Sequence, residues 1–253
     1  MHPLIHGWTD IDNRTLQTNT RLGAVLAFVA GAANAGGFLA VGTYTSHMTG
    51  IVSALADHLV LGELALAAAS LGALTAFLLG AMTTAWLVNW GLREKLKSAY
   101  GLPLLLESAL LLIFGIFGAA INVWSNFFVP LTVLLLCFIM GLQNAVITKI
   151  SKAEIRTTHV TGLVTDLGIE LGKLLYVNRS QRSTAEPVRA NRKKLRLQSI
   201  LLSSFFAGAV CGALGFKFLG YVTTVPLALT LLILVWRPVA HDVRERLPRS
   251  HSS

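Results

Sequence analysis

The segment at residues 64–91 reads LALAAASLGALTAFLLGAMTTAWLVNWG and holds no charged residue. An α-helix needs about 20 predominantly apolar residues to cross the hydrocarbon core of a bilayer, and this segment is longer than that. On both sides of this segment the chain also carries little charge. No Lys or Arg occurs between Arg21 and Arg93, and the only carboxylates in that interval belong to Asp57 and Glu63. Soluble domains do not bury an interval of that size almost without charge. The segment therefore predicts an integral membrane protein.

The whole chain has the same character. Of its 253 residues, 54% are hydrophobic and only 13% are charged, whereas soluble domains carry roughly a quarter charged residues. The net charge of +9 lies in connecting segments and not on a face of a soluble module. Basic residues crowd the connection at 178–197 and the tail at 238–253. This arrangement is typical of the positive-inside bias of membrane proteins, so no nucleic acid is expected as a partner.

Six apolar segments predict full transmembrane helices and hence an all-α polytopic membrane protein. Two further segments are helical in pattern but contain charged groups. Segment 47–62 contains Asp57 and His58, and segment 158–177 contains Asp166. The six apolar segments are 21–41, 64–91, 102–121, 128–148, 198–218 and 221–237.

An internal repeat relates the two halves of the chain. The sequence GAANA at 31–35 matches GLQNA at 141–145, at an offset of 110 residues. The sequence SHMTG at 46–50 matches THVTG at 158–162, at an offset of 112 residues. Small residues coincide often in apolar helices, but His-x-Thr-Gly recurring at nearly the same offset is more specific. The pattern predicts a duplication of the kind found in transporter folds.

Charge then decides the topology. If segments 47–62 and 158–177 both crossed the membrane, the basic connections would fall on opposite sides. If each enters only partway, as a re-entrant or half-helix, every basic connection is cytoplasmic. Three full spans per half then remain, so the halves run in opposite directions as an inverted 3+3 repeat. Segment 1–20 is expected to be cytoplasmic and has no signal-peptide core. The transmembrane domain is expected at 21–237, with repeat one at 21–121 and repeat two at 128–237. The loop 178–197 and the tail 238–253 are expected to be cytoplasmic.

The two polar helices predict a binding site. Half-helices that begin near Thr49 and Thr161 would direct free N–H groups and the positive ends of their dipoles into the bundle. Two such N-termini suit an anion or a polar neutral solute. Gly36, Gly37 and Gly42 are expected to loosen the backbone before the first half-helix. The candidate solute-binding residues are His47, Thr49, Gly50, His159, Thr161, Gly162, Asn34 and Asn144.

Structural roles stay open beside these functional ones. Either His47 or His159 could hold its turn by bonding a backbone carbonyl instead of binding a solute or relaying a proton. Asn34 and Asn144 could serve only as interhelical hydrogen-bonding residues.

Ionisable residues inside membrane segments are functional candidates by default. Asp166 and Asp57 are the candidates for a proton or cation coupling group. Glu107 is the remaining carboxylate that could face inward, and Glu170 is expected to pair with Lys173.

The sequence contains no nucleotide-binding glycine loop, no zinc-ligand spacing and no nucleophile elbow. No catalytic residue, no metal site and no cofactor is therefore expected, and the protein is expected not to be an enzyme. Its cysteines, Cys137 and Cys211, fall in apolar segments and are expected to be packing residues.

Three stretches carry a family resemblance: HMTG at 47–50, GLQNA at 141–145, and IRTTHVTGLVTDLG at 155–168. They resemble the YoaK-type family of bacterial integral membrane proteins, and the likeness covers most of residues 20–240. The resemblance implies a multi-pass location in the bacterial cytoplasmic membrane. It implies no activity, because that family is described as being of unknown function.

The leading hypothesis is a transporter or channel for a small anionic or polar neutral solute, bound between the two His-x-Thr-Gly half-helices. The alternative is a non-transporting scaffold or regulator that acts through its basic cytoplasmic segments, where 178–197 would attract anionic lipid headgroups. A third hypothesis is an intramembrane enzyme using Asp166 with His159. Assembly into a homo-oligomer is left open.

Overall fold

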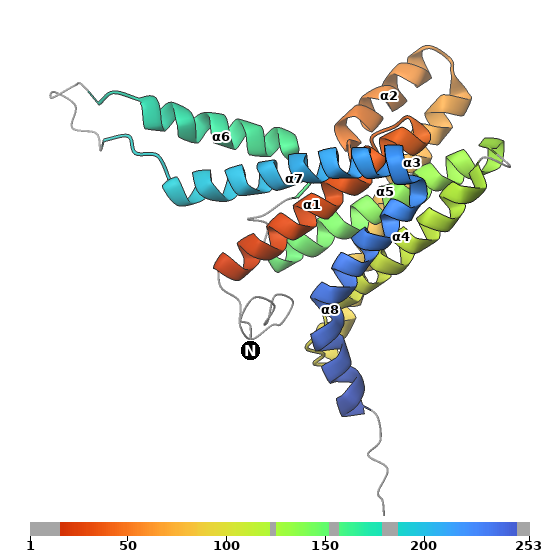
Figure 1. The fold of residues 1–253 in the computed structure, drawn as a ribbon. Coiled ribbons are helices and arrows are strands. Elements are labelled where there is room, and N and C mark those ends of the chain that lie inside the picture. The colour runs from red at the N-terminus through yellow and green to blue at the C-terminus, as the bar shows by residue number, and fades with distance from the viewer. Residues whose placement is uncertain (1–15, 122–124, 152–156, 179–186, 247–253) are drawn as a thin grey trace, which may run out of the picture.

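The computed structural model describes residues 16–121, 125–151, 157–178 and 187–246, and within them the chain is helical with no strand (Figure 1). Each apolar segment predicted from the sequence forms a helix, and the two polar segments form shorter helices, which confirms the all-α class. The helices are α1 (Leu16–Val41), α2 (Met48–Val60), α3 (Leu64–Arg93), α4 (Gly101–Ile121), α5 (Ser125–Ile150), α6 (Val160–Leu175), α7 (Arg192–Leu219) and α8 (Thr224–Arg246), with a 3-10 turn, η1, at Gly220–Thr223.

Four helical stretches of the described chain are long and apolar enough to cross a membrane. The first three are Gln17–Val41 in α1, the whole of α3, and Val129–Ile150 in α5. The fourth, Arg192–Glu245, joins α7, η1 and α8. Helix α2 and residues Gly101–Ile116 of α4 are shorter apolar helices. The chain is therefore a helical membrane protein.

Apolar side chains cover much of the outer surface. Val60, Leu64 and Phe206 are among many large apolar residues that are exposed. Soluble monomers rarely expose continuous apolar surface on this scale, whereas a bilayer requires it. The exposed indoles of Trp86 and Trp236 lie near the charged ends of α3 and α8, as is usual for tryptophans at a membrane–water interface.

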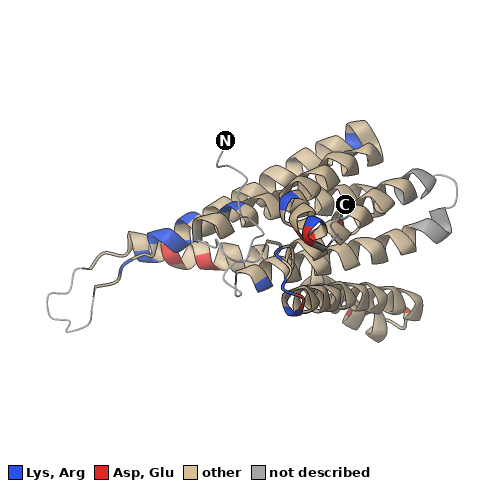
Figure 2. Ribbon diagram, turned by 90° about the horizontal axis from the view of Figure 1, so that it is seen from below, with Lys and Arg blue, Asp and Glu red and all other residues tan. Residues whose placement is uncertain are grey.

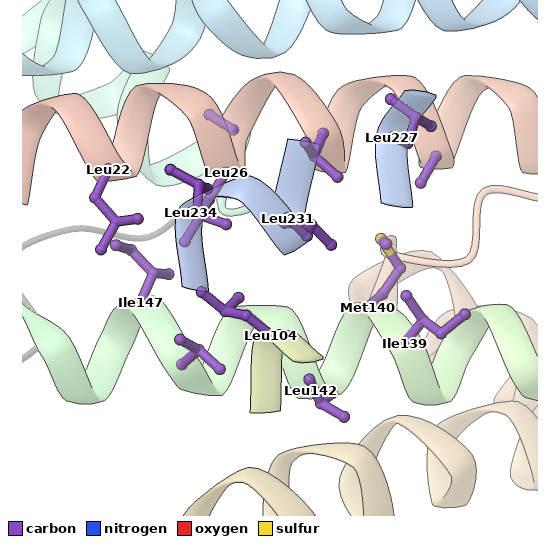
Figure 3. Close-up of a cluster of buried hydrophobic side chains, with 14 of the residues drawn as sticks. Leu22, Leu26, Leu104, Ile139, Met140, Leu142, Ile147, Leu227, Leu231 and Leu234 are labelled. Atoms are coloured by element: carbon purple, nitrogen blue, oxygen red, sulfur yellow. The ribbon is translucent and has the colours of Figure 1, made fainter. Parts of the chain in front are cut away.

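The largest buried cluster lies between α1 and α5, with α4 and α8 beside them (Figure 3). Leu22 and Leu26 of α1 lie in the same cluster as Met140 and Ile147 of α5. In a membrane the surrounding lipid is as apolar as these side chains, so close packing has to supply the attraction that water would otherwise supply.

Helices α1 and α7 achieve that close packing through glycine. A Cβ added to Gly31 would overlap the carbonyl oxygen of Phe205, and one added to Gly208 would overlap the carbonyl oxygen of Phe28. Each glycine therefore lies against the backbone of the other helix, at a distance that no other residue permits.

Helices α3 and α5 cross in the same manner. A Cβ on Gly80 would overlap the carbonyl oxygen of Phe138, and a Cβ on Gly141 would overlap that of Phe77. The sequence Phe-x-x-Gly thus marks each of these four helices at its crossing point, at 28–31, 77–80, 138–141 and 205–208.

One expectation about the first connection is wrong. Helix α1 continues through Gly36 and Gly37 to Val41, because Gly36 faces the ring of Phe216 and so serves packing. The break comes only at Gly42, whose φ of +73° lies in the left-handed region that favours glycine after a helix.

The C-terminal boundary also differs from the prediction. Helix α8 was expected to end at 237 but continues through Pro238 to Arg246, so the segment assigned to the tail begins as helix. A proline removes one helical hydrogen bond and normally favours a break. Here the carboxylate of Asp242 accepts hydrogen bonds from the backbone N–H groups of Lys97 (3.2 Å) and Ser98 (2.8 Å), which anchors the extended end against the chain just before α4.

The two cysteines differ in burial. Cys137 packs with Ile51 and Ala73, as expected of a packing residue. Cys211 is exposed on α7. The prediction holds for Cys137 alone.

Candidate functional site

Helices α2 and α6 begin with the same local geometry. The residue before each helix is a histidine, His47 with φ −89° and ψ 68° and His159 with φ −82° and ψ 58°, and neither side chain caps its own helix. Instead each imidazole folds back over the glycine three residues later. A Cβ added to Gly50 would overlap the ring of His47, and a Cβ added to Gly162 would overlap the ring of His159. The motif thus requires glycine at its fourth position, because the histidine ring occupies the space that a side chain would take.

The segment before α2 is held by α1. The side-chain oxygen of Asn34 accepts a hydrogen bond from the backbone N–H of Ser46 (3.2 Å) and another from its hydroxyl (3.0 Å). Thr45 and Thr157, each two residues before a histidine, are fully buried, and neither hydroxyl has a partner in the described chain. Asn34 therefore positions the turn that presents His47.

A cavity of about 650 Å³ lies where the two short helices begin. Figure 1 shows α2 and α6 starting near one another and then diverging, α2 toward the start of α3 and α6 along the N-terminal half of α7. Six of the eight candidate binding residues line this cavity: Asn34, His47 and Thr49 from the first half, and Asn144, His159 and Thr161 from the second.

The wall of this cavity combines polar and apolar groups. Neither Lys, Arg, Asp nor Glu is among the described residues that line it, so its polar groups are hydroxyls, amides and imidazoles. The first-turn N–H groups of two helices add donors and a favourable potential for negative charge. Phe77 and Phe205, from the two Phe-x-x-Gly crossings, supply apolar surface. Such a wall can hold a small anion or a neutral polar molecule by hydrogen bonding.

The remaining candidates lie elsewhere. Gly50 lies beneath His47 and is not part of the cavity wall. Asp57 is on an exposed face of α2 and lines neither cavity described here. Gly162 and Asp166 line a second cavity of about 540 Å³ between α6 and α7.

This second cavity adjoins the first, because His159 and Thr161 line both. Its charged end is formed by Asp166, one of whose carboxylate oxygens accepts a hydrogen bond from Gln198 (2.7 Å) and lies 3.3 Å from the ammonium of Lys194. The predicted coupling residue is therefore half-exposed and paired with groups of α7.

Farther along α6, Glu170 joins the two helices. Its side chain is 3% exposed and accepts hydrogen bonds from the Lys173 ammonium (2.9 Å), as the sequence predicts, and from the backbone N–H of Asn191 (2.7 Å). These two hydrogen bonds, the first above all, hold the pKa of Glu170 below its usual value. Asn191 caps α7 by accepting from the N–H of Lys194 (3.1 Å).

Sequence reasoning missed several residues that line the two cavities. The Phe-x-x-Gly repeat could have indicated the two phenylalanines, since it recurs at four positions. Nothing in the local sequence marks the others. The missed residues include Tyr44, Phe77, Thr148 and Phe205 in the first cavity, and Thr165, Lys194 and Gln198 in the second.

Fold and site together define a helical membrane protein with polar cavities among its helices. The chain belongs to the family described as protein of unknown function (DUF1275), whose family model matches residues 22–236. This match confirms the YoaK-type resemblance. No curated protein and no solved structure matches the chain. The family description gives no activity, so any function has to be argued from the geometry.

Proposed function

We propose that this protein is a transporter or channel for a small anionic or polar neutral solute, which binds in the cavity between the two His-x-Thr-Gly helix starts. The observation that carries the proposal is the composition of that wall. Residues of both halves, His47 with Thr49 and His159 with Thr161, contribute to one cavity of about 650 Å³. That volume lies within the range of about 300–1,000 Å³ that is usual for small-molecule sites.

The architecture we propose is the inverted 3+3 repeat, with α2 and α6 as half-helices. It is supported by the paired glycine crossings, because the contact of Gly31 with Phe205 has its counterpart in that of Gly141 with Phe77. It is also supported by the matched folding of His47 over Gly50 and His159 over Gly162. In this arrangement both termini and the 178–197 loop face the cytoplasm, and the membrane is the bacterial cytoplasmic membrane.

The second cavity extends the proposed route toward the cytoplasm. Because His159 and Thr161 belong to both walls, a solute leaving the central cavity along α6 would next meet Thr165, Gln198 and Lys194. In this route the Lys194 ammonium attracts an anion toward the entrance, while Asp166 partly neutralises the charge of that ammonium.

The experiment is an osmotic swelling assay on proteoliposomes containing the full chain. The probes are formate, acetate, nitrate, urea and glycerol, each offered as an inward gradient with light scattering as the readout. The proposal expects at least one probe to enter faster than in protein-free liposomes. His47→Ala and His159→Ala should both slow that entry, because each removes a ring from the cavity wall.

His58→Ala is the matched control. His58 is also on α2, but its ring pairs with Glu63 at 2.6 Å and lies outside the cavity. Its replacement should leave the entry rate unchanged. Swelling no faster than in protein-free liposomes for every probe, or equal slowing by all three histidine variants, would contradict the proposed site.

One observation favours the scaffold alternative. Helices α6 and α7 form an arm that projects from the bundle, and Lys and Arg gather along it (Figures 1 and 2). Arg189, Arg192 and Lys193 on this arm are exposed. If the scaffold function is correct, replacing these three by Gln should release a bound partner or anionic vesicles while His47→Ala and His159→Ala have no effect.

A further inference from the structure

A carboxyl group is buried in the apolar core, on α4, and does not line the cavity. Glu107 of α4 lies one helical turn from Leu104 and from Leu111, both of which belong to the main buried cluster. Its side chain is 0% exposed, and neither carboxyl oxygen has a hydrogen-bond partner in the described chain. Figure 3 shows the cluster to which Leu104 belongs, together with Leu142 of α5.

Among the described residues, no charged group compensates this carboxyl. Helix α4 packs against α8, α5, α3 and η1. Within the described residues, the titratable groups of these elements that have printed contacts are engaged elsewhere. Cys137 packs with Ile51, Lys149 bonds Asn89, Tyr221 packs on Phe114, Asp242 bonds the N–H groups of Lys97 and Ser98, and His241 contacts Lys97 and Glu245. The other titratable groups, Arg93 of α3 and Arg237 and Arg244 of α8, form no ion pair or hydrogen bond with Glu107.

An ionised carboxylate in this position would be prohibitively unfavourable. An unpaired charge is strongly disfavoured in an apolar medium, and such a group takes up a proton instead. Even the protonated form leaves a buried hydroxyl without a hydrogen-bond partner, a cost that a leucine would avoid. Glu107 therefore destabilises the fold relative to an apolar residue at the same position, and packing alone does not explain its presence.

A second buried polar group lies on α5, the helix against which α4 packs. Gln143 of α5 is buried, and its amide donates to the carbonyl of Leu26 (3.1 Å), but its own amide oxygen has no partner in the described chain. The next residue, Asn144, lines the cavity. Helix α5 thus packs against α4 and also contributes to the wall of the proposed solute site.

We propose that Glu107 is a proton-binding site that couples transport to protons. In the described conformation the carboxyl holds its proton. When the packing between α4 and α5 opens and water enters, the O–H bond breaks, the proton passes to water and a carboxylate remains. Re-protonation from water on return to the closed packing restores the neutral group. The coupling part of this inference rests on the proposed function, whereas the protonated state does not.

The protonated state can be read by infrared spectroscopy on the full chain in lipid. Glu107→Gln should abolish the carbonyl band of a protonated carboxylic acid at neutral pH. Glu63→Gln, a change at an exposed carboxylate paired with His58, should leave the band intact. Absence of the band from the wild-type protein, or its persistence in Glu107→Gln, would overturn the proposal. Should Glu107→Gln fail to fold, Glu107→Asp serves instead, because it should shift the carbonyl band. An unshifted band in Glu107→Asp would overturn the proposal in the same way.

The coupling is tested in the same proteoliposomes with a trapped pH-sensitive dye and whichever of the swelling probes enters. Wild-type entry should change the internal pH, and Glu107→Gln should lose that change while still binding the probe. If the probe enters without any pH change in the wild type, coupling through Glu107 is refuted and the transporter proposal stands. If no probe enters, the transporter proposal fails and coupling fails with it, while the infrared result still decides whether Glu107 binds a proton.

Discussion

The imidazole of His47 lies directly over Gly50, so that a methyl group at position 50 would occupy the space of the ring. The same relationship holds between His159 and Gly162. Because both rings border one cavity, the glycines determine how far each imidazole reaches into it. The glycine of the motif therefore determines where the imidazole ring lies.

Replacing the glycine should displace the ring. Gly50→Ala and Gly162→Ala are expected to reduce probe entry into proteoliposomes, since each forces the imidazole into the cavity, while helix content is retained. Gly172→Ala on α6 is the matched control, because a Cβ there meets nothing within 4 Å. That control should keep wild-type flux and gain up to about 1 kcal/mol of helix stability. Unchanged flux in both motif variants would refute the ring-placing role.

The glycine crossings should dominate stability. Gly31→Ala and Gly141→Ala each place a methyl group on a carbonyl oxygen of the facing helix. Separation of the helices or strain should lower stability by about 1–3 kcal/mol or more, measured as a drop in melting temperature in detergent. Gly168→Ala, with open space around its Cα, should not lower the melting temperature. Equal melting temperatures for all three variants would show that the crossings are not close-packed.

The turn before α2 should depend on Asn34. Asn34→Ala removes the acceptor for both the N–H and the hydroxyl of Ser46 and should cost about 1 kcal/mol per hydrogen bond. Asn34→Asp keeps an acceptor and should recover most of the stability. Hydrogen exchange at the Ser46 amide reports this directly. Exchange at Ser46 that is as slow in Asn34→Ala as in the wild type would contradict the role.

Acidification should loosen the arm. Hydrogen bonding from Lys173 and Asn191 lowers the pKa of Glu170. The ionised carboxylate therefore stabilises the contact at any pH above the ordinary pKa of a glutamate. This stabilisation is lost as the pH falls through the lowered pKa of Glu170. Spin labels at Ile169→Cys and Ser199→Cys, with Cys211 replaced by Ala, should show a fixed distance at neutral pH and a broader, longer one in strong acid. Glu170→Gln should show the broad distribution already at neutral pH. A spin-label distance distribution that changes neither in acid nor in Glu170→Gln would argue against this contact.

Orientation can be measured by thiol labelling. In the proposed topology, an impermeant maleimide should reach Arg189→Cys only from the cytoplasmic side and Gly62→Cys only from the outer side of intact cells. Both positions are exposed in connections between helices. Labelling of Arg189→Cys from the outside would contradict the half-helix arrangement of α2 and α6.

The sequence predicted the helices well because apolar length is a strong local signal. Each of the six apolar segments is a helix, and the polar segments became α2 and α6. Boundaries failed where a long-range contact decides them. Asp242 holds α8 together beyond Pro238, and the ring of Phe216 packs on Gly36 inside α1. Neither contact can be read from neighbouring residues.

The site was predicted in part for a similar reason. Repetition of His-x-Thr-Gly indicates two matched turns, and the cavity wall does contain His47 and His159. Repetition cannot show which longer helices pass beside those turns, so Phe77 and Phe205 were missed. The pairing of Asp166 with Lys194 was also missed, because these residues lie on different helices across the 178–197 loop.

The most direct test of a single solute site built from both halves is a thiol block. Thr49→Cys and Thr161→Cys are made one at a time with Cys211 replaced by Ala, since Cys137 is buried. Ser53→Cys, exposed on α2 but outside the cavity, is the control. The account predicts that a bulky methanethiosulfonate stops probe entry in both threonine variants and leaves the serine variant unaffected. A block in only one threonine variant, or in neither, would contradict it.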